Sequence, residues 1–160
     1  MNKEQGAYLL NFFRHVKKDS DPEVSILKSH LLIELLATNF ILKKVSRPEL
    51  IQDLNLRYYQ KIRLARALDN STTADWAWEA AERLNSIRNS LSHELTPKDL
   101  ETKIASLIEF IDSKAKLIEG FEEDFGLFIT RIIMVWVCLC AHLHFDPSAF
   151  SRQRKTLLTE

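Results

Sequence analysis

The clearest pattern in the chain is a stripe of apolar residues that repeats with the period of a helix between residues 73 and 94. Its members follow one another at intervals of 4, 4, 3 and 4 residues: Trp76, Ala80, Leu84, Ile87 and Leu91. Side chains at these intervals lie on one face of an α-helix. The turn and capping residues of the preceding segment, DNST at 69–72, mark its start. The pattern therefore predicts an amphipathic helix over residues 73–94.

Helix start and stop signals predict further helices in the rest of the chain. Pro22 and Pro48 suit the first position of a helix, and residues 96–99, TPKD, resemble a capping box. Gly120 supplies a stop. The expected helices cover roughly residues 4–17, 22–44, 57–68, 96–119 and 123–144, with a short one after Ser46.

The fold class follows from these elements and from the composition. Three glycines and four prolines in 160 residues are too few for a chain of many tight turns, and no strand pattern competes with the helical ones. We therefore expect an all-α fold, an antiparallel helical bundle in one domain over residues 1–150. Residues 151–160 are polar and are expected to form a frayed tail.

Charge and cysteine content narrow the classes of function. Twenty-two basic and 22 acidic residues give a formal net charge of zero, so any attraction for nucleic acid must come from a local patch. Cys138 and Cys140 project about 200° apart on a helix and cannot pair with each other, so they are expected to be buried, reduced thiols. The first 13 residues do not resemble a signal peptide. A cytoplasmic location is therefore expected.

The last expected helix is apolar on all its faces. Its uninterrupted run, Ile132 to Ala141, has ten residues, whereas a membrane span needs about 20, so we expect no membrane insertion. Such a helix has to be covered by the core or by a partner, which favours a homodimer. Trp76 fits the core stripe, and Trp78, which points to another side of its helix, is expected at a subunit contact.

Candidate chemistry lies at the end of the striped helix, in SIRNSLSHEL at residues 86–95. A guanidinium such as that of Arg88 can hold a phosphate with paired donors. An imidazole such as that of His93 can take a proton from a ribose 2′-hydroxyl or protonate the leaving 5′-oxygen. Asn89, four residues before His93, is placed to fix the imidazole tautomer. This chemistry needs no metal, and no metal or cofactor is expected.

Helix geometry alone does not bring the two groups together. In an ideal helix Arg88 and His93 are about 7.5 Å apart along the axis and about 140° apart around it. They serve one ligand only if Arg88 reaches round, the last turn opens, or a second subunit supplies half the site. The ordinary alternative is a solvated Arg88 and a His93 that complements the helix dipole.

Residues 87–93, IRNSLSH, resemble the signature of the HEPN superfamily: an apolar residue, Arg, a polar residue and, after a few more, His. The resemblance implies a small all-α bundle, commonly dimeric, and for many members a metal-independent RNase of toxin–antitoxin, abortive-infection or CRISPR-linked defence. In such proteins the Arg and His lie at a cleft between two subunits. This chain has Leu95 where the branch controlled by AMP transfer usually has Tyr.

The resemblance also points to Glu34, because family members often carry a polar residue inside an early apolar helix. Glu34 lies among leucines at residues 31–36, LLIELL, where a carboxylate is costly unless it is paired. One interpretation is that Glu34 pairs with Arg88 and holds the guanidinium in place. The other is a structural ion pair or a surface position.

A basic segment beside two tyrosines is a second candidate for RNA binding. Four cationic residues fall within ten positions, next to Tyr58 and Tyr59: Arg57, Lys61, Arg63 and Arg66. Such a segment can bind phosphates and stack on bases. The alternative is a solvated helix face.

Three hypotheses follow. The first is a HEPN-like endoribonuclease acting on RNA, with His93 as general acid and base, Arg88 as phosphate clamp, and Asn89 and Glu34 in support. The second is a non-catalytic interaction or regulatory module on the same fold, with an antitoxin or regulatory protein as partner. The third is a nucleotide-binding pocket without cleavage.

Overall fold

The computed structural model describes residues 3–17, 21–93, 98–115 and 126–144, with residues 3–5 and 93 described by their backbone alone. These residues form seven helices and no strand, and 82% of them are helical. The helices are α1 (Lys3–His15), α2 (Pro22–Lys44), α3 (Pro48–Gln52), α4 (Tyr58–Leu68), α5 (Asp75–His93), α6 (Leu100–Lys114) and α8 (Leu127–His142). The all-α prediction is confirmed.

The starts of α2 and α3 follow the sequence signals at Pro22 and Pro48. Asp21 caps α2 by accepting hydrogen bonds from the backbone N–H groups of Glu23 (2.8 Å) and Val24 (3.4 Å), and Pro22 takes the first helical position. The expected capping box at residues 96–99 lies partly outside the described residues, and α6 begins after Asp99 without a side-chain cap. The expected stop at Gly120, the expected start at residue 123 and the tail at 151–160 also lie outside them.

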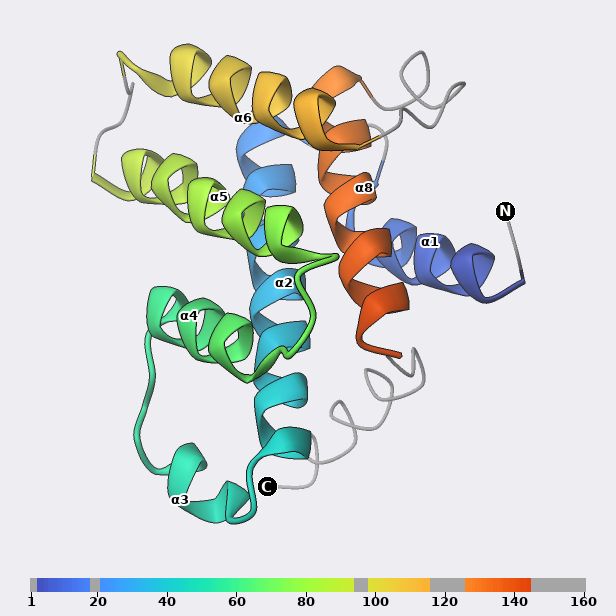
Figure 1. Ribbon diagram of the computed structural model, residues 1–160. Helices are drawn as coiled ribbons and strands as arrows, with labels where there is room; N and C mark the ends of the chain where they lie inside the picture. The colour runs from blue at the N-terminus through green and yellow to red at the C-terminus, as the bar shows by residue number, and fades with distance from the viewer. Residues whose placement is uncertain (1–2, 18–20, 94–97, 116–125, 145–160) are drawn as a thin grey trace.

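Helix α2 is the element on which the candidate site is built. It lies against α4, α5 and α8, and Figure 1 shows α4 and α5 on the same side of it. Helix α6 lies beside α5, and α8 packs against α1, α5 and α6. The predicted stripe on α5 faces this interior, since Ala80, Leu84 and Ile87 are buried and Trp76 and Leu91 are partly buried.

The expected subunit contact of Trp78 is wrong, and the apolar faces of α8 are covered by the core, while the homodimer itself stays a prediction. Trp78 is fully buried, and its indole N–H donates to Asp69 Oδ2 over 2.9 Å, so it belongs to the core of one copy. Helix α5 is enclosed by α2, α4, α6 and α8, which buries a second face that the stripe does not predict. All residues from Ile132 to Val137 are buried within a single copy, so α8 gives no reason to expect a second one.

The longest helix and the cysteines complete the description of the core. By length and mean hydropathy α2 is long and apolar enough to cross a membrane, yet 56% of its most apolar window is buried inside the molecule, as in a core helix. Both cysteines are free thiols, with Cys140 buried and Cys138 partly buried. Burial raises the pKa of Cys138 to about 11.

Candidate functional site

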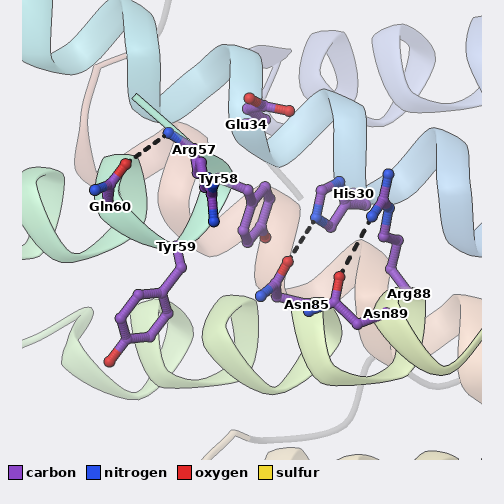
Figure 2. Close-up of a pocket in the computed structure, with 9 residues that line it drawn as sticks. All are labelled: His30, Glu34, Arg57, Tyr58, Tyr59, Gln60, Asn85, Arg88 and Asn89. Carbon is purple, nitrogen blue, oxygen red and sulfur yellow. Dashed lines mark hydrogen bonds between the residues drawn. The ribbon is translucent and has the colours of Figure 1, made fainter. Parts of the chain in front are cut away.

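A polar hollow of about 680 Å³ opens between α2, the first turn of α4 and α5, as Figure 2 shows. We call it the Arg88 hollow. It is lined by His30 and Glu34 of α2, by Asn85, Arg88 and Asn89 of α5, and by residues at the start of α4: Arg57, Tyr58, Tyr59 and Gln60.

Helical spacing places these side chains. His30 and Glu34 are four residues apart, so they share one face of α2, and the α5 residues fall at positions i, i+3 and i+4. The start of α4 is held by Gln60, whose Oε1 accepts the backbone N–H of Arg57 over 2.9 Å. Each helix thus contributes a polar stripe next to its apolar one.

The wall of the hollow is an aromatic stack of His30 on Tyr58. Their ring centroids are 3.7 Å apart with an interplanar angle of 19°. Tyr58 is anchored by a hydrogen bond of 3.0 Å from its hydroxyl to the carbonyl of Ala81. Burial raises the pKa of Tyr58 well above its ordinary value, so the hydroxyl stays protonated.

The protonation of His30 is set by its burial. His30 is 5% exposed, and desolvation lowers its pKa despite a hydrogen bond with Asn85 and the nearby charge of Glu34. Its Nε2 lies 3.1 Å from Asn85 Oδ1. In the neutral ring, a proton on Nε2 lets that nitrogen donate to the carboxamide and leaves Nδ1 as an acceptor.

Arg88 supplies positive charge to the hollow. Figure 2 shows its side chain extending from α5 toward α2 beside His30. Its Nη1 donates to Asn89 Oδ1 over 3.3 Å, and no carboxylate of the described residues lies within 4.0 Å of its guanidinium. By contrast, Arg131, which is almost fully buried, is paired with Asp112, and Arg66 with Asp75.

Glu34 pairs with Lys61, not with Arg88. Lys61 Nζ lies 2.8 Å from Glu34 Oε1, and the two side chains are 23% and 24% exposed. Of the two interpretations of Glu34, the structural ion pair is the one that the contacts favour. Its carboxylate nevertheless lines the Arg88 hollow, so a ligand bound there would contact a carboxylate whose charge is balanced by Lys61.

Of the four cationic residues of the basic segment at 57–66, one lines the hollow and the other three have acidic partners. Arg57 is exposed, lines the hollow and has no carboxylate partner among the described residues. Arg63 lies 3.7 Å from Glu82, and Arg66 makes two 2.6 Å hydrogen bonds to Asp75 and one of 3.3 Å to Glu82. Only Arg57 of the expected RNA-binding set therefore offers a free charge to this site.

His93 is the last residue of α5, and its side chain lies outside the described residues. Asn89, which was expected to hold the imidazole, accepts a hydrogen bond from Arg88. Among the described residues no group of three or more His, Cys, Asp or Glu side chains is arranged to hold a metal ion.

The sequence patterns did not point to His30 or Asn85, nor to the stacking of Tyr58 on His30. The signal was present as two four-residue spacings, HLLIE at residues 30–34 and NSIRN at residues 85–89. Each places two polar side chains on one helix face, and the two faces meet across the hollow.

No family model, curated protein or solved structure matches this chain in the comparisons made. The likeness to the HEPN superfamily therefore rests on the IRNSLSH motif and the features around it.

Proposed function

We propose that this chain is a metal-independent endoribonuclease with a HEPN-like antiparallel bundle. In this proposal Arg88 clamps an RNA phosphate and His93 acts as general acid and base. The observation that carries it is a guanidinium in a polar hollow, without a carboxylate partner among the described residues and five residues before a histidine at the end of the same helix. We place the enzyme in the cytoplasm, in a toxin–antitoxin or phage-defence system with an antitoxin or regulatory protein.

The charge of the hollow supports phosphate as the ligand. Arg57 and Arg88 bring two positive charges, and Glu34, the one carboxylate among the described lining residues, is already paired with Lys61. The partly buried Arg88 guanidinium loses hydration and has no carboxylate counterion among the described residues, so an anionic ligand would supply that interaction. Arg57 immediately precedes α4 and Arg88 lies on α5, so the two charges reach the hollow from different segments of the chain.

The proposed reaction moves one proton in each direction. A His93 imidazole takes the proton of the ribose 2′-hydroxyl, and the 2′-oxygen attacks the phosphorus that Arg88 holds. The bond from phosphorus to the 5′-oxygen breaks, and a second imidazole, protonated, gives its proton to that oxygen. The products are a 2′,3′-cyclic phosphate and a 5′-hydroxyl. Asn89 supports the clamp through its hydrogen bond with Arg88.

Two imidazoles imply two copies of the chain. An exposed apolar stripe on α2 supports this part of the proposal: Val24, Leu27 and Leu31 are 40%, 40% and 60% exposed and follow at intervals of three and four residues. Leu27 and Leu31 adjoin His30 and Glu34 on the helix surface. A second copy that covers this stripe would border the Arg88 hollow and complete it.

The test is cleavage of labelled single-stranded RNA in EDTA, with mass spectrometry of the product ends. We expect cyclic phosphate ends, and loss of cleavage in His93→Ala and in Arg88→Ala. The matched control is Arg83→Ala, because Arg83 lies on the same helix but pairs with Glu79 and lies over the Phe110 ring, outside the hollow. Circular dichroism and sedimentation check that each variant is folded and dimeric.

Cleavage that survives His93→Ala removes the catalytic assignment. A folded dimer that binds RNA through Arg88 without turnover indicates the nucleotide-binding alternative instead. A protein that neither binds nor cleaves RNA, but forms a complex with a second protein, indicates the regulatory module.

A further inference from the structure

A second hollow of about 470 Å³ lies next to the Arg88 hollow. Tyr59, Asn85 and Asn89 line both, so the two hollows are neighbours that share part of their walls. The remaining lining of the second comes from α5 and α6: Glu82, Ser86, Ser90 and Lys103. We call it the Lys103 hollow.

The two hollows differ in charge. The Arg88 hollow holds two guanidiniums without carboxylate partners in the described part of the chain. In the Lys103 hollow, Lys103 is paired with Asp99 and donates to Ser90 Oγ over 2.6 Å, and Glu82 is paired with Arg66. A phosphate is therefore favoured in the first, and a neutral group with several hydrogen-bonding atoms in the second.

The lining of the Lys103 hollow matches a nucleobase. Tyr59 is 48% exposed, and Figure 2 shows its ring standing apart from the His30–Tyr58 stack. The Arg63 guanidinium lies over one face of this ring, 5.7 Å from its centroid, so a base would stack on the opposite face. Asn85 and Asn89 use their carboxamide oxygens within the protein, and their amino groups are donors that can reach a base edge.

We propose that the Lys103 hollow is a subsite for an unpaired base next to the phosphate at Arg88, with Tyr59 as its stacking platform. The inference rests on the proposed function and deepens it, because it makes the substrate class single-stranded RNA. A base stacked in a duplex cannot enter such a subsite without leaving its partner.

Calorimetry with uncleavable ligands tests the subsite. The probe is a dinucleotide of 2′-deoxyuridine and adenosine. In each of its two controls, one nucleoside is replaced by a methyl group, so the control has a single base and keeps the charge of the phosphodiester. We expect the dinucleotide to bind at least about ten-fold more tightly than either control. Tyr59→Ala should remove about ten-fold of that affinity, and Tyr59→Phe, which keeps the ring, should retain it. Neither variant should change the affinity for the control that lacks the stacked base.

The outcomes separate the subsite from the proposed function. The subsite alone is overturned if the dinucleotide and its controls bind with equal affinity, or if Tyr59→Ala binds the dinucleotide as tightly as the native protein. Both conclusions require that Arg88→Ala abolishes binding of the methyl phosphodiesters. If those esters bind equally to Arg88→Ala, or do not bind the native protein, the phosphate site itself is wrong and the subsite falls with it. Competition by a longer RNA duplex that is as strong as competition by one of its strands alone also overturns the subsite.

Discussion

Asp69 joins the loop after α4 to the core and gives the sharpest test of how this fold is held together. Its side chain is 7% exposed and accepts hydrogen bonds from Trp78 Nε1 (2.9 Å) and the backbone N–H of Ser71 (3.1 Å), and His142 Nε2 lies 2.9 Å from it. These partners come from the same loop, from α5 and from the end of α8. One carboxylate therefore connects segments that are 73 residues apart in sequence.

Replacing this carboxylate by a methyl group, in Asp69→Ala, removes all these interactions. Hydrogen bonds to a charged acceptor contribute about 1.5–3 kcal/mol each, and an unsatisfied buried donor such as the Trp78 indole adds to the loss. We expect the free energy of unfolding to fall by about 3–5 kcal/mol, because Trp78, Ser71 and His142 all lose their hydrogen-bond acceptor. That is a large part of the 5–15 kcal/mol typical of a domain.

Urea denaturation followed by far-UV circular dichroism measures this loss. The control is Asp75→Ala, since Asp75 is 46% exposed and its partner Arg66 retains Glu82, so we expect about 1 kcal/mol there. Equal losses in the two variants would refute the reasoning, because they would show that the buried position of Asp69 adds nothing.

The same carboxylate makes stability depend on pH. Burial alone would raise the pKa of Asp69, but the hydrogen bonds from His142, Trp78 and Ser71 outweigh it and hold the pKa below its ordinary value. The stabilisation is then complete above the unfolded-state pKa of about 4 and is lost as pH falls through the lower pKa of the folded state. The native protein should lose stability on acidification more steeply than Asp69→Ala.

Two further predictions concern groups that burial keeps uncharged. His30, whose pKa is lowered chiefly by desolvation, should titrate below a free imidazole in NMR spectra of its ring protons, and its contribution to stability should be lost as pH falls below about 6.5. A His30 that titrates at or above 6.5 would contradict this. Cys138, with its pKa raised to about 11, and the buried Cys140 should react with a thiol reagent at pH 8 only in denaturant. Rapid reaction of the folded protein would show that the thiols are accessible.

The helices were predictable because their signals are local. The stripe on α5 and the Asp21-Pro22 start of α2 depend on residues within one or two turns, and both were confirmed. The side of a helix that meets a neighbour is not a local property. Trp78 looked exposed from the stripe alone, and it is buried because α5 is packed on more than one face.

Some of the residues that line the Arg88 hollow were predictable, but their pairings were not. The motif pointed to Arg88 and Asn89, and the basic segment to Arg57, and all three line one hollow. Which cation pairs with Glu34 depends on how α4 crosses α2, which no spacing within a helix specifies. Lys61 of α4 takes that position, and this long-range pairing could not be inferred from the sequence.

That pairing also explains why a chain with equal numbers of acidic and basic residues can present a positive site. Glu34 lines the same hollow as Arg88 and would be its natural counterion, yet its carboxylate is held by Lys61, which does not line the hollow. A net charge of zero therefore does not require each guanidinium to be neutralised locally. Lys61 pairs with the only carboxylate in the described lining, so the Arg88 guanidinium remains available to bind an anion from solution. The phosphate proposal depends on this pairing of Glu34 with Lys61 instead of Arg88.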